Sequence, residues 1–324
     1  MLSTSHEWQH GKLQSITATR IGAEYGFGGR VYRVEGETDE GASVSLIAKE
    51  EDRASVERAL AFRKHNTTTM GAWIPRLYGS HFGDGGELGV LLMEDISPNI
   101  QGDVLSGCSA AQAERLIRTL ARLHTSSLDA GSMERDEELP RWQARPMEHE
   151  VWTERLSLTS ERYPEILTTE ISGRLANLPG TIDEAGAALG SGDSCWIHAD
   201  MHLDNVLFRP DDSAVILDWA NARIGPPALD LAHLLTEGLD TGDAESRFSQ
   251  WLPIYRKEAA RSGVGLDLGE LRSSIGWAIL PLLQGTIGWA GRAEEPAPRL
   301  MKVRENLLRN TCAWLETDVV PDVG

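Results

Sequence analysis

The hydrophobic pattern of this chain changes near residue 96, and this change limits the folds that the chain can adopt. Before that point, short runs of β-branched residues alternate with turn residues, and one helical pattern at 52–65 interrupts them. Beyond it helical patterns dominate, apart from two short apolar runs at 195–218. We therefore predict an α+β fold in which residues 1–96 form a small β-rich lobe and residues 97–324 form a larger, mostly helical lobe.

The best-defined helix in the second lobe is predicted at 109–124. Ser109 and Gln112 have the spacing of a capping box at its start, and leucines follow along one face. Further helices are predicted at 148–157, 164–178, 228–235, 243–261, 268–291 and 298–315. Strands are expected again only around 195–218, so the residues between those two apolar runs lie on a turn that a helical scaffold positions.

The chain carries a net charge of −18, with 49 acidic against 31 basic residues. Such a charge repels phosphate backbones and argues against a nucleic-acid partner. Of the acidic residues, 35 lie after position 96, in the helical lobe. This distribution favours a cationic or sugar-like small molecule as partner, although an acidic surface that only aids solubility has the same composition.

The three cysteines, Cys108, Cys195 and Cys312, are odd in number and far apart. They predict neither a disulfide framework nor a zinc site, which suits a reducing compartment. The first residues lack the basic start and apolar core of a secretory signal. The longest uncharged run, 275–291, is shorter than the roughly 20 residues of a spanning helix. We expect a cytoplasmic protein without a membrane segment, either a monomer or a homodimer.

The stretch "WIHADMHLDN" at 196–205 gathers groups that bind metals and transfer protons, and "AVILDWA" follows at 214–220. Three interpretations are open. His198, Asp200 and His202 alternate along an extended segment, a spacing that suits the zinc or iron site of a metal-dependent hydrolase. In a structural interpretation, the histidines are hydrogen-bonding groups and the acids form the turn.

The third interpretation is phosphoryl transfer, in which the protein mainly positions the reactants and neutralises charge. One carboxylate must take the proton of the attacking hydroxyl, and hard oxygen ligands must hold Mg²⁺ against the triphosphate. Asp200, Asn205 and Asp218 supply these groups. Mg²⁺ prefers oxygen ligands, so Asn205 and Asp218 suit it in a way that the histidines do not.

Phosphoryl transfer also requires a cation on a strand and a flexible turn near the nucleotide phosphates. Lys49 ends the apolar run "VSLIAK", and Gly26, Gly28 and Gly29 lie in the turn "YGFGG" before it. Taken alone, the glycines are also typical of a plain hairpin. The order of glycine turn, strand lysine, Asp-x4-Asn and strand aspartate favours phosphoryl transfer over the other two interpretations.

Three segments are the most specific: "LLMEDI" at 91–96, "HADMHLDNVLF" at 198–208 and "VILDWANARIGPPALDLA" at 215–232. With these segments the chain resembles the aminoglycoside phosphotransferase and choline kinase-like family, small-molecule kinases with a bilobal protein-kinase-like fold. The resemblance runs from about residue 15 to the last helix. It implies ATP and Mg²⁺ as cofactors, with GTP an open alternative to ATP, and a hydroxyl of a small molecule as phosphate acceptor.

The resemblance also assigns roles to particular residues. It implies that Asp200 is the catalytic base, that Asn205 and Asp218 are the metal ligands, and that Lys49 binds nucleotide phosphates. A nucleotide-binding protein without activity, a pseudokinase that scaffolds a partner, is the alternative. The presence of all four residues argues against that alternative.

The adenine pocket is expected at the end of the apolar run at 88–96. The resemblance implies that Met93 lines the back of the pocket, and that the carbonyl of Glu94 and the amide of Ile96 contact the base. The rings of Phe27 and Trp219 are further candidates to close the nucleotide site, or are packing residues.

The sequence departs from the family pattern at the glutamate that should pair with the lysine. A carboxylate is needed there to aim the amine at the phosphates. Glu57, on the predicted helix at 52–65, is the favoured candidate, and Glu50 and Glu51 on the strand are alternatives. Where protein kinases carry Phe-Gly after the metal aspartate, this chain has Trp219 and Ala220, which puts activation-loop switching in doubt.

Acceptor contacts are expected from the helical lobe. His202 is a candidate to contact the acceptor or the transferred phosphate, or to brace the turn. Glu237 is a candidate to bind an amino group, and Trp289 to stack on a sugar or cover an ammonium ion, although core packing also explains a tryptophan there. Asp230, in "GPPALDLA", is expected to anchor the turn that carries Asp200 by hydrogen bonds at a helix start.

Overall fold

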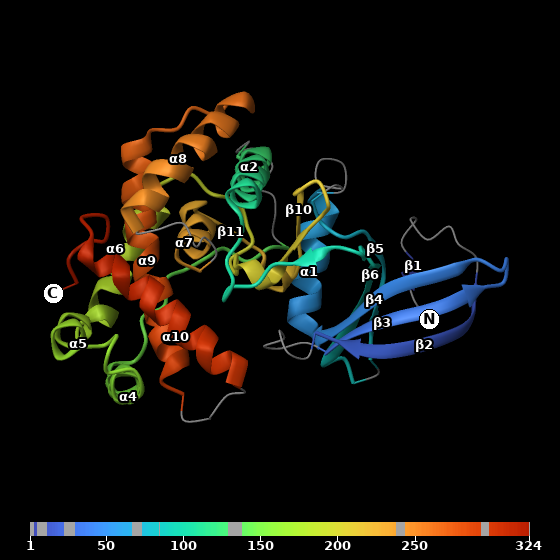
Figure 1. Cartoon of the computed structure of the whole chain (residues 1–324), viewed down its shortest axis with the longest axis horizontal. Coiled ribbons are helices and arrows are strands. Elements are labelled where there is room, and N and C mark those ends of the chain that lie inside the picture. The colour runs from blue at the N-terminus through green and yellow to red at the C-terminus, as the bar shows by residue number, and fades with distance from the viewer. Residues whose placement is uncertain are drawn as a thin grey trace. The chain divides into compact units, whose positions relative to one another are not determined.

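The computed structural model describes residues 3–4, 12–22, 30–66, 73–83, 85–128, 138–237, 244–292 and 298–323. The chain folds into two compact units (Figure 1). The first unit consists of Met1–Ile100 and Val206–Ala222, and the second of Gln101–Asn205 and Arg223–Gly324. This division differs from the sequence-based one, because 206–222 packs with the β-rich unit rather than with the helices.

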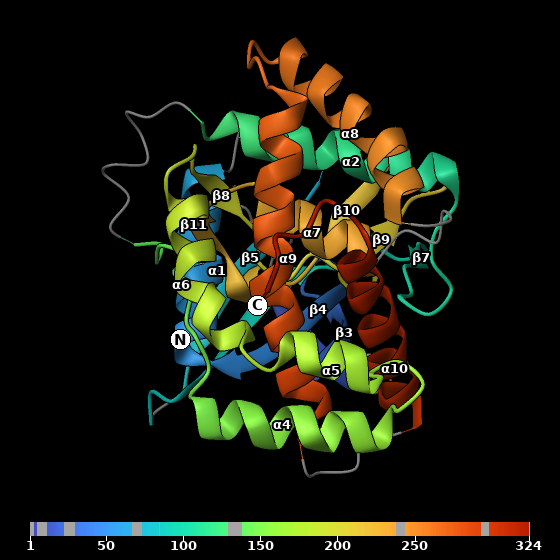
Figure 2. The ribbon, with the colours of Figure 1, turned by 90° about the vertical axis from the view of Figure 1, so that its left-hand side faces the viewer.

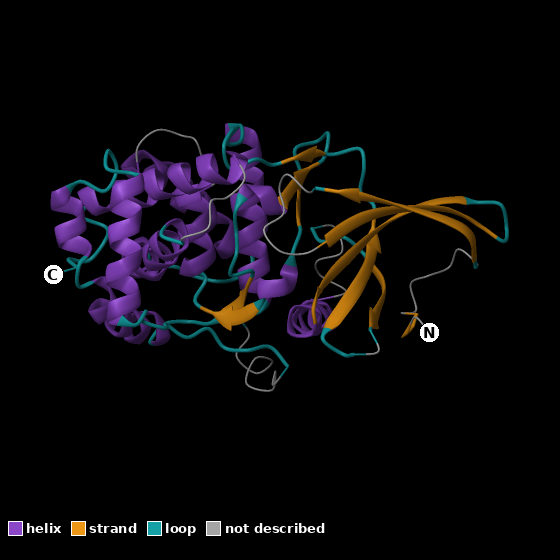
Figure 3. Ribbon diagram, turned by 90° about the horizontal axis from the view of Figure 1, so that it is seen from below, coloured by secondary structure: helices purple, strands orange, loops and turns teal. Residues whose placement is uncertain are grey.

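The first unit is built on an antiparallel sheet in the order β1-β5-β6-β4-β3-β2 (Figure 3). One helix, α1, connects β4 to β5, as the sequence predicts. The elements are β1 (Ser3–Thr4), β2 (Leu13–Ile21), β3 (Arg30–Thr38), β4 (Ser43–Asp52), α1 (Arg53–Asn66), β5 (Leu77–Phe82) and β6 (Leu88–Glu94). Because β4 lies between β3 and β6, Lys49 is opposite Val31 on one side and Leu91 on the other.

Helix α1 begins where Asp52 accepts hydrogen bonds from the amide and hydroxyl of Ser55, which provides a cap for its first turn. Its buried side chains include Val56 and Phe62. The ring of Phe62 stacks on Trp219, with 3.8 Å between ring centroids and 5° between planes. This stacking joins α1 to the distant segment 206–222.

The segment 206–222 contains a short hairpin, β9 (Val206–Phe208) and β10 (Ala214–Ile216), followed by a 3-10 turn, η2 (Trp219–Asn221). The Ile216 amide donates to the carbonyl of Trp73, and Arg58 in α1 donates to the carbonyl of Ala220 at 2.5 Å. Together with the Phe62–Trp219 stack, these bonds explain why the segment belongs to the first unit.

The second unit is mostly helical, as predicted (Figure 3). Its helices are α2 (Ala110–Ser126), α4 (His149–Arg162), α5 (Thr169–Leu175), α6 (Leu178–Gly190), α7 (Ala228–Glu237), α8 (Ala244–Arg261), α9 (Leu268–Ala290) and α10 (Pro298–Cys312), with 3-10 turns η1 (Leu203–Asn205) and η3 (Ala313–Glu316). The capping box of Ser109 and Gln112 forms at the start of α2. Helix α6, rich in glycine and alanine, is not predicted from the sequence.

Two short strands also belong to the second unit: β8 (Cys195–Ile197) pairs antiparallel with β11 (Arg223–Gly225). Strand β7 (Ile100–Gln101) spans the border between the units. The pairing of β8 with β11 places residues 198–202, which follow β8 directly, at the end of a buried strand. The sequence predicts strands in this region but not this partner.

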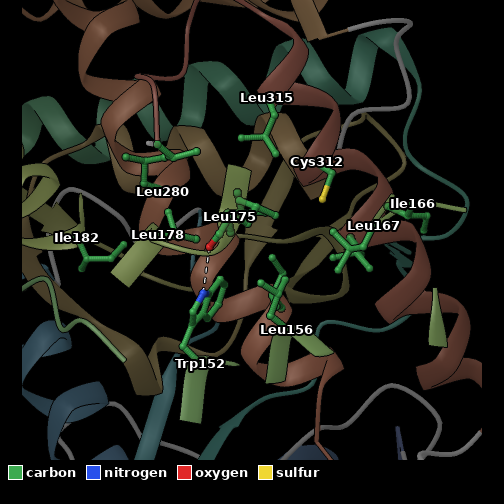
Figure 4. Close-up of a cluster of buried hydrophobic side chains, with 14 of the residues drawn as sticks. Trp152, Leu156, Ile166, Leu167, Leu175, Leu178, Ile182, Leu280, Cys312 and Leu315 are labelled. Atoms are coloured by element: carbon green, nitrogen blue, oxygen red, sulfur yellow. Dashed lines mark hydrogen bonds between the residues drawn. The ribbon is translucent and has the colours of Figure 1, made fainter. Parts of the chain in front are cut away.

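Helix α9 lies at the centre of the second unit, in contact with α4, α6, α7 and α10 (Figure 2). A buried apolar cluster surrounds it, and the Trp152 indole in this cluster donates to the carbonyl of Leu175 at 3.0 Å (Figure 4). The long uncharged run is therefore core, as predicted. In the described part of the chain, no helix combines the length and apolarity needed to span a membrane.

Candidate active site

Lys49 lies near the end of β4 in the first unit and is largely buried, with 11% of its side chain exposed. Its ammonium group is 2.7 Å from Oε1 of Glu51 and 2.5 Å from Oδ1 of Asp218. Lys49 and Glu51 are two residues apart on one strand, so their side chains lie on the same face. Asp218 follows β10 and has a left-handed backbone conformation, with φ of 56°. The structure thus brings together two of the predicted nucleotide-site residues.

The charges in this cluster influence one another. Burial alone would lower the pKa of the Lys49 ammonium, but the carboxylates of Asp218 and Glu51 outweigh it and raise that pKa. Burial raises the pKa of the Glu51 carboxyl despite the attraction of Lys49, and the negative charge of Asp218 adds to the rise. Lys49 therefore stays a cation, whereas burial makes the ionised form of Glu51 less favourable than it is in water.

The sequence predicts that Glu57 pairs with Lys49, but in the structure Glu57 pairs with Arg53 instead. The Glu57 carboxylate is exposed on α1 and accepts a hydrogen bond from Arg53, one helical turn away, at 2.7 Å. Glu51, which the sequence offers as an alternative, is the glutamate that pairs with the lysine. Glu51 shares the face of Lys49 on the strand, whereas the buried face of α1 presents Val56, Ala59 and Phe62 instead of Glu57.

In the second unit, the turn after β8 carries Asp200. The backbone amides of His198 and Ala199 donate to the two carboxylate oxygens of Asp230, at 2.7 and 2.8 Å. Ala199 has a positive φ of 60°, a conformation that a residue with a Cβ rarely adopts. The fully buried Asp230 in α7 therefore anchors a strained turn, as the sequence predicts, and the next side chain along that turn is Asp200.

Asn205, in η1, is held against the same turn. Its side-chain nitrogen is 2.9 Å from the carbonyl oxygen of Asp200 and 3.1 Å from Nε2 of His202. A carbonyl oxygen can only accept, so the amide nitrogen must face it and the amide oxygen must point the other way. Because the nitrogen donates to Nε2 of His202, that ring nitrogen is an acceptor. His202 thus braces the turn, one of the two roles proposed for it.

Asp200 itself is partly accessible, with 36% of its side chain exposed. Its Oδ1 is 3.6 Å from Nε2 of His202. The arrangement gives an accessible carboxylate whose backbone is fixed on both sides, by Asp230 before it and by Asn205 after it. Such a group can accept a proton from a hydroxyl held next to it.

Comparison with known proteins decides the family. The phosphotransferase enzyme family matches residues 21–261, well over half of the chain. The chain belongs to the phosphotransferase enzyme family. The family and the fold predicted from the resemblance are therefore confirmed.

Solved structures agree on the fold of this phosphotransferase. A candidate aminoglycoside phosphotransferase from Ralstonia eutropha JMP134 is 16% identical, with a TM-score of 0.58 over 95% of each chain. An amicoumacin kinase in complex with AMP-PNP, Ca²⁺ and its ligand is 14% identical, with a TM-score of 0.55 over 96% of this chain and 91% of that one. A microcompartment-associated aminopropanol kinase is 15% identical, with a TM-score of 0.54 over 96% of each chain.

A curated relative, acyl-CoA dehydrogenase family member 11 of Rattus norvegicus, is 31% identical over 121 residues. The match covers 37% of the phosphotransferase but only 14% of that relative. The matched residues thus correspond to a small part of that longer relative, and the similarity concerns this part alone.

The phosphotransferase has a second acidic group near Asp200 that the sequence analysis does not single out. Asp204 is buried in η1 and accepts hydrogen bonds from the Val104 amide at 2.9 Å and from the Arg299 guanidinium at 3.0 Å. Its own carbonyl accepts from the Gln101 side chain at 2.5 Å. The negative charge of Asp204 is therefore balanced by Arg299 within the second unit. Sequence spacing gives no signal for it, because its partners lie about 100 residues away on either side.

Glu237 is the acceptor-side candidate that the structure buries, with 7% of the residue exposed at the end of α7. Its Oε1 is 3.8 Å from Nδ1 of His233, one turn earlier. Burial raises the pKa of the Glu237 carboxyl well above its usual range, and the negative charges of Asp200 and Asp204 add to this. Burial lowers the pKa of His233, although nearby carboxylates oppose it.

Trp289 lies in α9 and is half-buried. The guanidinium carbon of Arg304 lies 4.6 Å from the centroid of its ring. A cation–π contact within the chain thus already uses this ring. The proposed acceptor role of Trp289 stays a prediction.

The predicted adenine contacts are at the end of β6. Met93 and Glu94 are the last two residues of that strand, and Ile96 lies just beyond it. Arg63 contacts the Met93 sulfur at 3.8 Å, and the Ile96 carbonyl accepts from the Asn99 side chain. Their roles toward a nucleotide stay predictions. Gly26, Phe27, Gly28 and Gly29 lie outside the described residues.

Within the described residues, no three side chains of histidine, cysteine, aspartate or glutamate come together as a metal-binding group. A magnesium site of the predicted kind needs only two protein ligands besides phosphate and water oxygens. The amide oxygen of Asn205 and the carboxylate of Asp218 are hard oxygen donors and fit that ion chemically.

Proposed function

We propose that this phosphotransferase moves the γ-phosphate of ATP, with Mg²⁺, to a hydroxyl of a small, polar, amino-bearing acceptor such as an aminoglycoside, an amino sugar or a related metabolite. The observation that carries the proposal is the braced turn, which presents the accessible carboxylate of Asp200 on a backbone fixed by Asp230 and Asn205. Family membership and the AMP-PNP complex of the similar amicoumacin kinase support the nucleotide.

In the proposed reaction, the carboxylate of Asp200 accepts the proton of the acceptor hydroxyl. The hydroxyl oxygen forms a bond to the γ-phosphorus, and the bond from that phosphorus to the β,γ-bridging oxygen breaks, which leaves ADP. Lys49, a cation held by two carboxylates, binds the phosphates of the nucleotide. Asn205 and Asp218 would hold the magnesium ion, which supplies positive charge to the triphosphate.

The proposal of an amino-bearing acceptor is supported by Glu237. Burial raises the pKa of the Glu237 carboxyl, and an ammonium ion bound next to it would favour its ionised form and offset the cost of burial. The second unit also carries most of the negative charge of the chain. The similar aminopropanol kinase is named for an acceptor that combines one amino and one hydroxyl group.

For the setting of the enzyme we propose the cytoplasm. None of Cys108, Cys195 and Cys312 is in a disulfide bond, and the last two are buried, as expected in a reducing compartment. We propose that its partners are small molecules rather than nucleic acids, and that it acts as a monomer or a homodimer.

The experiment that tests the proposal is a thermal-shift screen of the purified protein with Mg-ATP and Mg-GTP, alone and with candidate acceptors. Each amino-bearing acceptor is paired with its deaminated counterpart, for example 1-amino-2-propanol with 1,2-propanediol. Mass spectrometry then detects phosphate transfer to each compound that shifts the melting temperature. We expect a Mg²⁺-dependent nucleotide shift and phosphorylation of an amino-bearing compound in preference to its counterpart.

Other outcomes favour the alternatives. A nucleotide shift with no transfer to any acceptor would support a nucleotide-binding pseudokinase. No nucleotide shift, together with zinc or iron in elemental analysis, would support the hydrolase interpretation of His198, Asp200 and His202. Equal transfer to paired compounds would contradict recognition of the amino group.

A further inference from the structure

A buried chain of hydrogen bonds crosses three helices of the second unit. The hydroxyl of Tyr255 in α8 is 2.8 Å from Nδ1 of His124 in α2, and Nε2 of His124 is 3.2 Å from Oδ2 of Asp230 in α7. All three side chains are inaccessible to solvent or nearly so, with 1% of Tyr255 and 0% of the other two exposed. None of them is positioned to touch solvent-borne substrate, yet the last one anchors the turn of Asp200.

The chemistry of the three groups determines which of them donates in each hydrogen bond. Burial alone would raise the pKa of Asp230, but hydrogen bonds from His124 and from the backbone of the turn outweigh it and lower that pKa. The carboxylate of Asp230 can therefore only accept, which places a proton on Nε2 of His124. In a neutral imidazole Nδ1 then accepts, and the Tyr255 hydroxyl donates to it. Burial raises the pKa of Tyr255, so the phenol keeps that proton.

Asp230 links the hydrogen bonds of Tyr255 and His124 to the turn. Its Oδ2 accepts from both the His124 ring and the His198 amide, and its Oδ1 accepts from the Ala199 amide. The positive φ of Ala199 needs such support, since a residue with a Cβ is strained in a left-handed conformation. The orientation of one carboxylate thus sets the backbone that leads into Asp200.

Helix α2 contacts the same strand and turn a second time. The hydroxyl of Ser127, at the end of α2, accepts from the amide of Trp196 in β8 at 2.8 Å. His124 and Ser127 are one turn apart, so one end of one helix holds two points of the segment 196–199. An apolar side chain at position 124 would fill the core equally well but would give neither hydrogen bond of the ring.

We propose that His124 and Tyr255 are positioning residues, which orient Asp230 and through it the turn that carries Asp200. The proposal rests on the role of Asp200 in the proposed function. His124 supplies the third donor to a buried carboxylate, and Tyr255 donates to the other ring nitrogen and so holds the ring in the orientation that this donation needs.

The test compares two replacements of His124, each of which keeps a polar group near only one of the two ring nitrogens. His124→Gln retains a donor near the position of Nε2, and His124→Asn retains only a group near Nδ1. Tyr255→Phe removes the donor to Nδ1 that holds the ring in place. The control is Thr311→Val, because Thr311 is also fully buried and loses a hydroxyl hydrogen bond, to the Leu307 carbonyl in α10.

The measurement is hydrogen–deuterium exchange of the full chain, read at the amides of His198 and Ala199. We expect exchange about tenfold faster in His124→Asn, a change of less than about threefold in His124→Gln, and an intermediate rate in Tyr255→Phe. Thr311→Val should exchange at these two amides like the unchanged protein. Equal rates in all four variants, or equal acceleration in Gln and Asn, would overturn the proposal.

A spectroscopic measurement keeps the proposal testable if His124→Asn does not fold. Nitrogen-15 NMR of labelled histidine distinguishes the two ring tautomers. We expect the Nε2–H tautomer for His124 in the unchanged protein; an Nδ1–H tautomer would overturn the proposal. Neither measurement uses a nucleotide, so the two proposals can fail separately. The expected exchange rates and tautomer without any phosphate transfer would refute the proposed function and leave the role of His124 and Tyr255 standing.

Discussion

The two units hold their functional carboxylates by different means. In the first unit, Asp218 is bound by the ammonium group of Lys49, which also binds Glu51. In the second unit, Asp230 is bound mainly by backbone amides and one ring nitrogen, and Asp200 follows from the backbone that they fix. Ion pairs can exchange partners when a charged ligand arrives, whereas bonds to backbone amides hold a shape. The ion pairs of the first unit can therefore rearrange around a charged ligand, whereas the turn of Asp200 keeps its shape.

The strongest test of the difference between the two units is to neutralise one aspartate in each. Asp200→Asn should lower the rate of phosphate transfer by about 10²- to 10⁴-fold, because the base is lost, and should keep the thermal shift with Mg-ATP. Asp218→Asn should weaken that thermal shift as well, because a metal ligand is lost. Transfer assays and melting curves of the two variants decide the matter. Equal loss of nucleotide binding in both would contradict the separate roles.

The anchor of the turn should matter most for stability. Asp230→Ala leaves two backbone donors and the His124 ring without their acceptor, so we expect the free energy of unfolding to fall by about 3–5 kcal/mol. Urea unfolding measures this change. Asp183→Ala, at an exposed acidic residue in α6, is the control and should change stability by less than about 0.5 kcal/mol. A small effect at Asp230 would mean that the turn holds its shape without this carboxylate.

The ion pairs of the first unit predict a different result. Because burial raises the pKa of Glu51, its ionised form is less favourable in the folded protein than in the unfolded chain. Glu51→Gln should therefore leave stability at neutral pH unchanged or raise it by up to about 1 kcal/mol, yet weaken Mg-ATP binding through Lys49. Glu57→Gln should leave Mg-ATP binding unchanged. Titration of nucleotide binding and urea unfolding compare the two; a larger loss of binding in Glu57→Gln would restore Glu57 as the lysine partner.

The smallest expected effect is a pH dependence at Glu237. A carboxyl whose pKa is raised by folding contributes stability below its unfolded value, and this stability is lost as the pH rises through the folded value. Glu237→Gln should thus unfold at the same urea concentration as the unchanged protein near pH 4, and at a higher one at pH 8. Other titrating groups are common to both proteins and cancel. A constant difference across this range would show that Glu237 is not the titrating group.

Much of this arrangement can be predicted from the sequence, because it depends on local pattern. The capping box at Ser109, the strand that carries Lys49 and the turn of Asp200 all follow from short-range spacing. Helix α6 could not be predicted in this way. Its sequence "LPGTIDEAGAALG" contains three glycines and a proline, and it is stabilised by packing against α9 rather than by propensity.

Long-range contacts set the rest. The choice of Glu51 over Glu57 depends on which face of α1 is buried, and that depends on Phe62 meeting Trp219 from a segment more than 150 residues later. The same stack moves 206–222 into the first unit. Asp204 and the chain from Tyr255 to Asp230 likewise join residues about 100 or more positions apart, which no spacing rule connects.

The placement of 206–222 also has a consequence for how the protein is made. A ribosome that has released residues 1–100 has released every strand of the six-stranded sheet, but not the Trp219 that stacks on Phe62 or the Ala220 carbonyl that binds Arg58. The first unit is complete only after residue 222, by which time half of the second unit has been synthesised. Folding during synthesis therefore cannot run unit by unit, and residues 1–100 expressed alone would expose the apolar face of α1.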